Sequence, residues 1–215
     1  MSARLSLFED IYKNAAAASL PAGARFLFVV HGAVQIDGQE IPSGGVWSGE
    51  GTVTCTGGAE GGTVWRWELS HGEAAAFNAT EVSTRLKLSA SLDTLPEGEL
   101  LLRGDSVAFP PGGTALTHTH QGPGIRCMIE GGIRIDTHGR STSYGPGGAW
   151  FETGPDTVFA QADPARASRF IRAMILPRAL LGQSSIRYAF EEDKAKPKSQ
   201  KYQVFVDRPI SFVRK

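Results

Sequence analysis

Two histidines separated by one residue, His118 and His120, are the side chains in this 215-residue sequence best suited to chemistry. Alternate side chains of an extended strand project to the same face, so both imidazoles would point in one direction. A neutral imidazole is a common metal ligand, and two of them supply two donors of a facial transition-metal site. The surrounding segment, GGTALTHTHQGPGIRCMIEGG at 112–132, is rich in Gly, Thr and apolar residues. This composition favours a barrel interior over an exposed strand.

The composition predicts the elements that would position this pair. Gly and Pro number 26 and 12 and are spread along the whole chain, with short runs rich in Val, Ile, Phe, Trp and Thr between them. Short runs of this kind between turn residues are typical of an all-β sandwich or barrel. The length suits one large all-β domain or two domains of about 100 residues each.

An internal repeat favours two domains. RFLFVVHGAVQIDG at 25–38 matches GIRCMIEGGIRID at 124–136 with an offset of 99, which aligns Gly32 with Gly131. The match resumes with an offset of 103, where GVW at 45–47 meets GAW at 148–150. We expect the four extra residues of the second half in the loop THGRSTSYGPG. Two β units in tandem indicate a duplication, and the period is too long for a solenoid.

The repeat and the tail predict three segments. We expect a first barrel at 1–80, a second barrel carrying the histidines at 81–182, and a tail at 183–215. The tail holds a charged connector, EEDKAKPKSQK, and then a strand-like alternation, YQVFVDRPISF. A terminal strand after a long connector pairs with a distant sheet, either in the same chain or across a dimer.

The histidine motif and the duplication resemble the cupin superfamily (RmlC-like), in its two-barrel bicupin form. The first cupin motif runs roughly G-x5-H-x-H-x3–4-E-x6-G, and Gly112, His118, His120 and Gly131 stand at matching positions. Gly124 stands where the motif has Glu. The resemblance implies two tandem cupin barrels, each a double-stranded β-helix or jelly roll, with a metal site in the second.

The first half of the repeat lacks the two histidines. With the offset of 99, Ser19 and Pro21 stand in their places, and Pro cannot ligate a metal. We therefore expect the first barrel to be degenerate, packed and metal-free.

The second cupin motif also departs from its usual form, because Phe159 stands about where its closing His is expected. Some cupins without the first-motif Glu carry an acidic residue near the second-motif turn. WFETGPD at 150–156 resembles that variant, which implies Glu152 as the carboxylate ligand. Gln161 would be a weak fourth ligand or a hydrogen-bond donor. Two imidazoles and a carboxylate suit a divalent transition metal (Fe, Mn, Ni or Zn), and ligand type does not choose among them.

Three side chains are expected to face a substrate: Arg126, Tyr144 and Phe159. Arg126 shares the inward direction of the histidines if the strand stays regular. A buried guanidinium needs a partner, so Arg126 has two interpretations. It forms a structural ion pair with Glu152 or Glu130, or it anchors a substrate carboxylate. No residue is assigned a catalytic role.

Three functions remain open. The first is a metal-dependent dioxygenase or isomerase acting on a small organic molecule. The second is a non-catalytic cupin that binds a small ligand. The third is a vestigial site in a protein with a structural or oligomeric role. The fold alone does not select among them.

Charge and hydropathy exclude other classes. Lys plus Arg and Asp plus Glu number 22 each, so the chain lacks the basic excess of a nucleic-acid-binding protein. It has no run of about 18 apolar residues, so no membrane span is expected, and the N-terminus does not read as a signal peptide. We expect a cytoplasmic protein whose two cysteines are buried thiols. Resemblance and the terminal strand predict a homodimer.

Overall fold

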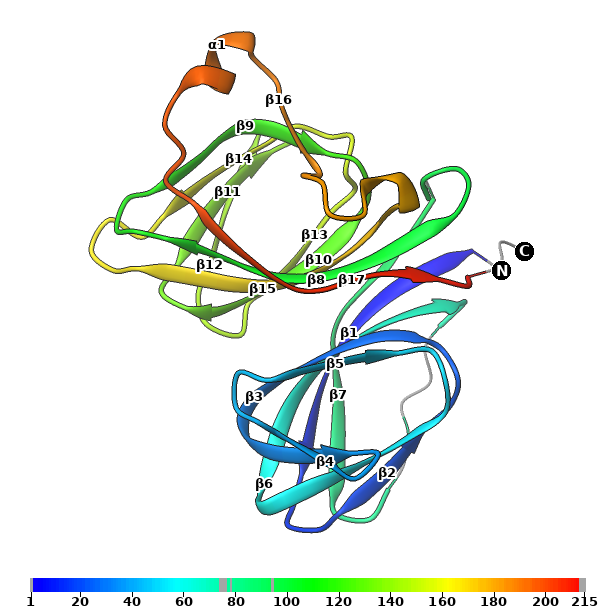
Figure 1. Ribbon diagram of the computed structural model, residues 1–215. Coiled ribbons are helices and arrows are strands. Elements are labelled where there is room, and N and C mark those ends of the chain that lie inside the picture. The colour runs from blue at the N-terminus through cyan, green and yellow to red at the C-terminus, as the bar shows by residue number, and fades with distance from the viewer. Residues whose placement is uncertain (1, 74–76, 78, 94, 213–215) are drawn as a thin grey trace. The chain divides into compact units, whose positions relative to one another are not determined.

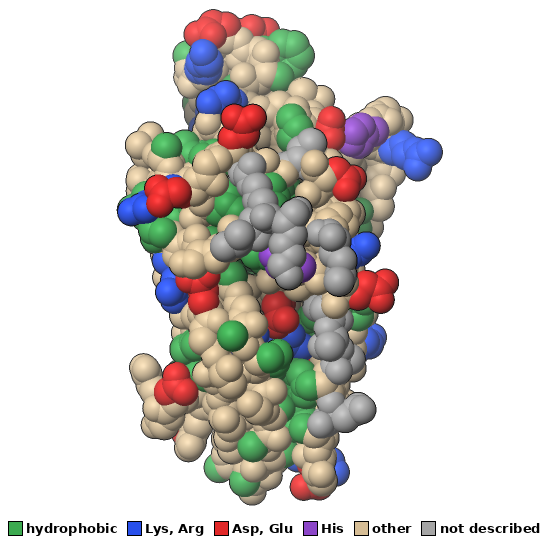
Figure 2. Space-filling model, turned by 90° about the vertical axis from the view of Figure 1, so that its right-hand side faces the viewer, with side chains coloured by type: hydrophobic (Ala, Val, Ile, Leu, Met, Phe, Trp, Pro, Cys, Tyr) green, Lys and Arg blue, Asp and Glu red, His purple; other side chains and the backbone are tan. Residues whose placement is uncertain are grey.

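The computed structural model describes residues 2–73, 77, 79–93 and 95–212. Its described elements are almost all β-strands (Figure 1), which confirms the predicted all-β class. The chain divides into two compact units, 1–93 with 210–215 and 94–209, here called the first barrel and the second barrel. No helix among the described residues is long and apolar enough to cross a membrane. On the face shown in Figure 2, acidic and basic side chains are scattered, with no large patch of one charge.

The first barrel is one seven-stranded sheet, with strand order β4-β3-β6-β1-β7, to which β2 and β5 pair through β6 and β3. The 19-residue β6 pairs with β2 at its start and with β1 over its later part, so one long strand serves both sides of the barrel. Buried apolar side chains, among them Leu27, Val34 and Val64, fill its interior. The strands are β1 (Ala3–Tyr12), β2 (Ala17–Leu20), β3 (Ala24–Ile36), β4 (Gln39–Pro42), β5 (Val46–Gly49), β6 (Val53–His71) and β7 (Val82–Ser91).

The second barrel has two five-stranded sheets that curve around a common interior (Figure 1). One sheet has the order β13-β10-β15-β8-β17 and the other β12-β11-β14-β9-β16. The elements are β8 (Leu100–Phe109), β9 (Thr114–His120), β10 (Gly124–Glu130), β11 (Ile133–Thr137), β12 (Arg140–Tyr144), β13 (Ala149–Glu152), β14 (Val158–Ala162), β15 (Ser168–Pro177), a 3-10 helix (Arg178–Leu180), β16 (Ile186–Tyr188), α1 (Glu191–Ala195) and β17 (Lys201–Ile210).

The two halves of the repeat form the same backbone hydrogen bonds. Gly44 N donates to Val29 O, and Gly147 N donates to Met128 O, each at 2.8 Å. The two carbonyls stand 99 residues apart and the two glycines 103 residues apart, which are the offsets of the sequence repeat. Each half is therefore built from the same strand and turn.

The four extra residues of the second half lengthen a hairpin rather than a loop. Asp37 and Gly38 turn the first hairpin with φ of 51° and 79°, and His138 and Gly139 turn the second with φ of 50° and 69°. Positive φ at both central residues is the geometry of a tight hairpin turn that follows the sheet twist. The turns stand 101 residues apart, so two extra residues precede the second turn and two follow it.

The boundaries of the units differ from the expected segments. β7 pairs with β1, so the first barrel extends past residue 80 to residue 93. β17 lies beside β8 in the sheet of the second barrel, so the terminal strand pairs within the chain. Both differences arise because a distant strand supplies the hydrogen bonds that would otherwise be missing at a sheet edge.

A polar layer divides the core of the second barrel. Along β15, Phe170 belongs to one apolar cluster and Met174 to another, and the buried Arg172 lies between them. On β8 the buried Asp105 likewise stands between Val107 and Leu101. The layer that interrupts the apolar core is where the site lies.

Candidate functional site

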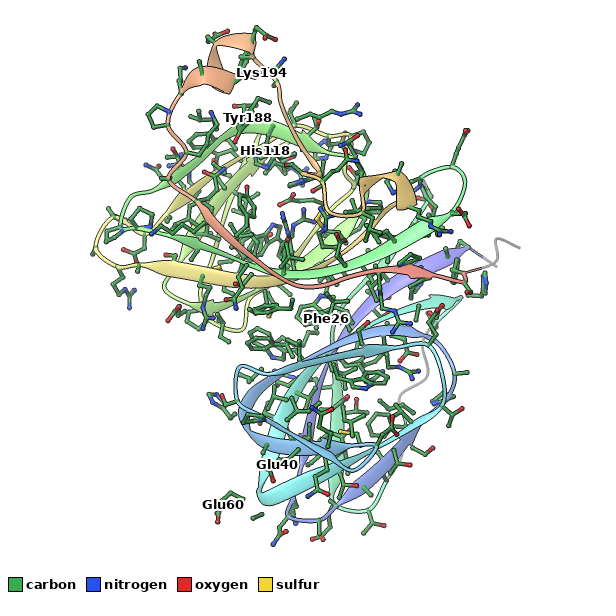
Figure 3. The ribbon with its side chains drawn as sticks, in the orientation of Figure 1. Phe26, Glu40, Glu60, His118, Tyr188 and Lys194 are labelled. Atoms are coloured by element: carbon green, nitrogen blue, oxygen red, sulfur yellow. The ribbon has the colours of Figure 1, made fainter. Side chains whose placement is uncertain are left out.

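Four inward-facing polar side chains meet in the second barrel, and Figure 3 shows His118 among the side chains that fill its interior. His118 and His120 project from β9, Arg126 from β10 and Glu152 from β13. All four are buried. The predicted alternation on β9 is confirmed, because both histidines are buried and Thr119 between them is not.

The two imidazoles present their Nε2 atoms to each other. His118 Nδ1 donates a 2.7 Å hydrogen bond to the Leu116 carbonyl, so its Nε2 carries a lone pair. That Nε2 lies 3.2 Å from His120 Nε2, and the rings are nearly perpendicular. Burial lowers the pKa of both imidazoles, that of His120 to about 3. Both side chains are therefore neutral at physiological pH.

Glu152 connects the imidazoles to Arg126. Its Oε1 accepts a 2.8 Å hydrogen bond from Trp150 Nε1, while Oε2 lies 3.3 Å from His120 Nε2 and 2.7 Å from Arg126 Nη2. Burial acts to raise the pKa of Glu152, but Arg126 and His120 outweigh it and hold the pKa well below its usual range. Burial lowers the pKa of Arg126 to about 10, so this pair is ionised at neutral pH.

Several polar atoms of the site are buried without a well-formed hydrogen bond, among them His120 Nδ1, whereas Glu152 Oε2 has the Arg126 guanidinium at 2.7 Å. A buried polar atom without a well-formed hydrogen bond is costly, and a bound ion is one way in which such a site is completed. Ligands about 2.1 Å from a metal stand about 3 Å apart when they are neighbours in a facial site. The 3.2 Å and 3.3 Å separations on either side of His120 are of that size.

The donor set is open rather than closed. Within the described ranges, no group of three or more His, Cys, Asp or Glu side chains is arranged as it stands to hold a metal ion. His120 stands in the middle of the row, and Glu152 Oε2 is held by Arg126. The donor types fit a divalent transition metal, and closing the triad requires Glu152 to move from Arg126 toward the imidazoles.

Phe159 and Gln161 do not join the site. On β14 the buried side chains are Val158, Ala160 and Ala162, so Phe159 and Gln161 lie on the other face of the strand. On that outer face, the guanidinium of Arg134 lies over the ring of Phe159, with 5.9 Å from Cζ to the ring centroid. Gln161 lines an open surface pocket. The expected roles of Gln161 as a ligand and of Phe159 at the substrate are therefore not supported by the geometry.

Tyr144 reaches the site only through Trp150. Its ring stacks on Trp150 with centroids 4.9 Å apart, and its side chain lines surface pockets on the outside. Arg126 is fully buried, and its Nη1 donates a 2.6 Å hydrogen bond to Gly124 O. Its ion-pair partner is Glu152, one of the two acidic residues that the sequence suggested. This ion pair occupies the guanidinium that a substrate carboxylate would otherwise bind.

Three polar residues of the layer, Asp105, Arg172 and Tyr202, were not predicted. Arg172 on β15 donates from Nε and Nη2 to the two carboxylate oxygens of Asp105 on β8, at 2.7 and 2.9 Å. Tyr202 on β17 lies against Arg172, with 5.6 Å from Cζ to the ring centroid. The signal for Arg172 and Asp105 was the presence of charged residues within two largely apolar runs, SRFIRAMILP and LLLRGDSVAF.

A small cavity lies at the centre of the layer, lined by apolar side chains and by six polar ones: His118, His120, Arg126, Glu152, Arg172 and Tyr202. Its volume is about 20 Å³. A single water needs about 10–15 Å³ by this measure. The inner cavity therefore has room for an ion or one water molecule, but not for an organic molecule.

Comparison with known proteins finds relatives in structure but not in sequence. No family model and no curated protein matches the chain. The formate complex of Lactobacillus farciminis oxalate decarboxylase has a TM-score of 0.66 at 11% identity, covering 89% of this chain and 82% of that one. A serine-to-alanine mutant of Bacillus subtilis oxalate decarboxylase has a TM-score of 0.62 at 12% identity, covering 80% and 68%.

A third similar structure is a cupin 2 conserved barrel domain protein from Leptotrichia buccalis, with a TM-score of 0.50 at 13% identity. It covers 81% of this chain and 84% of its own. Identities this low show the fold alone. The strand topology and these likenesses together show that the chain has the cupin fold, as two tandem jelly-roll barrels.

Proposed function

We propose that the second barrel binds one divalent transition metal ion through His118, His120 and Glu152, and that the protein is a metal-dependent enzyme acting on a small organic molecule. The observation that carries this proposal is the convergence of two imidazole Nε2 atoms with a buried carboxylate oxygen, at separations of 3.2 and 3.3 Å.

The ligands are in the protonation states that a metal needs. Metal binding requires neutral imidazole and ionised carboxylate. The low pKa values of His118, His120 and Glu152 meet that requirement at neutral pH. The hydrogen bond from His118 Nδ1 to a backbone carbonyl also orients its ring, as the hydrogen-bond partners of metal-bound histidines do.

Manganese is the first ion to test. A structure similar to this chain, at 10% identity, concerns the Mn(II) centers of Bacillus subtilis oxalate decarboxylase. Fe, Ni and Zn suit the same donors. A bound ion with open coordination positions would supply Lewis-acid or oxygen chemistry, so a dioxygenase or an isomerase is the reaction class we propose. In the absence of the ion, Arg126 balances the charge of Glu152.

The proposal assigns one ion to each chain. In the first barrel the pairs Arg25–Gly49 and Leu27–Trp47 have the register of Gly124–Glu152 and Arg126–Trp150 in the second. Gly49 thus stands where Glu152 stands. The strand register corrects the offset of 99 here: Leu20 pairs with Val53 as His118 pairs with Val158, so Leu20 rather than Ser19 stands in the place of His118, and the segment 17–23 contains no histidine. The counterpart of the metal site in the first barrel contains none of its ligands.

Metal analysis tests the proposal. Protein purified without chelators and reconstituted with Mn(II) or Fe(II) is expected to hold about one ion per chain, because one barrel carries ligands. The double variant His118→Ala/His120→Ala is expected to hold none. His31→Ala, which removes an exposed histidine, serves as the matched control and should keep the ion. Wild-type protein that holds no transition metal after reconstitution would overturn the proposal.

We also propose that the chain is an RmlC-like bicupin that acts as a cytoplasmic homodimer. β17 is the edge strand of its sheet and leaves backbone groups available for pairing with a second copy. Both cysteines are buried thiols, as suits a reducing compartment. Light scattering at several protein concentrations tests the dimer, and a monomer mass at all of them would contradict it.

A further inference from the structure

A second cavity adjoins the inner one on the side of β17. Its volume is about 320 Å³, and its walls include Ile186, Val204 and the backbone of 182–185. It shares two residues, Arg172 and Tyr202, with the inner cavity, so these two side chains separate the chambers. We call it the outer cavity.

Size decides which chamber can hold an organic ligand. The inner cavity, at about 20 Å³, holds no more than an ion or a water molecule. The outer cavity, at about 320 Å³, is within the range of small-ligand sites, which begins at about 300 Å³. A small organic molecule beside Arg172 and Tyr202 therefore has space in the outer cavity but not in the inner one, and a separate surface pocket of about 490 Å³ lies at His120 on another side.

Most charged groups around the outer cavity are already occupied. Arg103 donates from Nε and Nη2 to Asp207, and from Nη1 and Nη2 to the Gln183 and Leu180 carbonyls. Asp207 Oδ2 also accepts from Gly182 N. This network attaches the segment around 180–183 to β8 and β17. It forms the wall of the cavity and has little capacity left for a ligand.

The guanidinium of Arg172 has N–H groups that are not used in its bonds to Asp105. A guanidinium is planar, and the bond pair from Nε and Nη2 to Asp105 uses one side of it. Nη1 lies on the opposite side and donates to no described residue, so its N–H groups point away from Asp105. Ser185 adds a buried hydroxyl whose described partner is only the Met174 sulfur, at 3.8 Å. The available polar groups are mainly donors.

The rest of the wall is apolar and aromatic. Ile186, Tyr202 and Val204 line it, and Tyr202 and Val204 remain 46% and 53% exposed at its mouth. Exposed aromatic and apolar side chains around a cavity provide a surface for an apolar ligand body. The solvent at the mouth also lets a bound anion keep part of its hydration.

We infer that the outer cavity is a binding site for a small monocarboxylate with an apolar, one-ring body. Its carboxylate accepts hydrogen bonds from Arg172 Nη1 and Ser185 Oγ, and its ring packs against Tyr202, Ile186 and Val204. This inference rests on the proposed function in one respect: if the second barrel is an enzyme, the ligand of the outer cavity is its substrate class. The cavity and its donors exist without a metal.

Calorimetric titration with benzoate tests the inference on metal-free protein. Benzoate has the carboxylate and the single ring, while benzamide has the same shape without the charge. Benzoate is expected to bind at least about tenfold more tightly than benzamide, because Arg172 favours the anion. Val204→Trp fills the cavity from an exposed position and should weaken benzoate by at least about tenfold. Gln203→Trp, on the opposite face of β17, is the matched control and should bind as wild type does.

Arg172→Lys gives an independent measurement. A lysine retains the charge beside Asp105 but has no second face of donors, so benzoate affinity should fall while the protein stays folded. Absent benzoate binding, equal affinity for benzamide, or unchanged affinity in Val204→Trp would each overturn the inference. Metal content is measured on the same samples. Val204→Trp that loses benzoate but holds Mn(II) separates this inference from the proposed function, which fails only if wild type takes no metal.

Discussion

Arg126 Nη2 lies 2.7 Å from Glu152 Oε2, the same oxygen that lies 3.3 Å from His120 Nε2. One carboxylate oxygen is therefore shared between a permanent cation of the protein and the imidazole row. A divalent ion at the imidazoles must compete with Arg126 for that oxygen. If the proposed ion binds, the guanidinium of Arg126 stabilises the metal-free protein and opposes metal binding.

Replacing Arg126 with methionine tests this competition. Without metal, Arg126→Met leaves the Glu152 carboxylate buried and unpaired, a change that costs about 3–5 kcal/mol. Added Mn(II) should restore much of that loss, so its effect on the melting temperature should be larger for the variant than for wild type. Thermal unfolding with and without Mn(II) measures both effects. Arg134→Met, on the outer face of the same barrel, is the control, and an equal Mn(II) shift in all three proteins would refute the competition.

The buried histidines predict a loss of stability in mild acid. The pKa of His120 is about 3 in the folded chain and about 6.5 when unfolded, so the unfolded state binds protons first. Above pH 6.5 the neutral His120 costs the folded state no stability. As the pH falls from 6.5 toward 3, protonation of the unfolded chain lowers the free energy of unfolding. Between pH 6.5 and 4.5 this loss amounts to about 2 kcal/mol. Glu152 adds its own loss mainly below this window, because its unfolded pKa is about 4.5 and its folded pKa is lower.

Urea unfolding at several pH values between 7.5 and 4.5 measures that slope. His120→Asn removes the titrating group while keeping a small polar side chain. Its free energy of unfolding should change less over this window than that of wild type. Parallel pH profiles for the two proteins would show that burial of His120 is not the cause.

Two glycines of the second barrel with positive φ, Gly131 and Gly139, give a further prediction. Gly131 has a φ of 73°, and a Cβ there would lie 2.3 Å from the Ala167 carbonyl oxygen. Gly139 has a φ of 69° but open space around it. Gly131→Ala should therefore destabilise the chain clearly more than Gly139→Ala, which carries only the left-handed strain of about 1–2 kcal/mol. Chemical denaturation compares the two, and equal losses would contradict the close approach at Gly131.

The sequence predicted much of the second barrel because its signals were local. The i, i+2 spacing of His118 and His120 determines their common face wherever the strand lies. Glu152 was expected from the resemblance of WFETGPD to a cupin variant, and it lies on the same face of its strand as Trp150, to which it is hydrogen-bonded. The repeat predicted the shared turn through its glycines.

Other features depend on long-range register, which local spacing does not contain. Val158 and Phe159 are both apolar, so the sequence did not show which of them faces inward on β14. Phe159 was expected at the site, but Val158 is the buried residue. The Asp105–Arg172 pair joins residues 67 apart, and it forms only because β8 and β15 align them directly. Tyr202 enters the site because β17 adds to the sheet from the far end of the chain.

The most direct test of the metal site is a crystal structure of Mn(II)-loaded protein with anomalous diffraction at the manganese edge. The proposed site predicts a single anomalous peak per chain, about 2.0–2.2 Å from the Nε2 atoms of His118 and His120, with Glu152 turned from Arg126 toward the ion. A loaded crystal without a peak at these residues, or with its peak elsewhere in the chain, would contradict it.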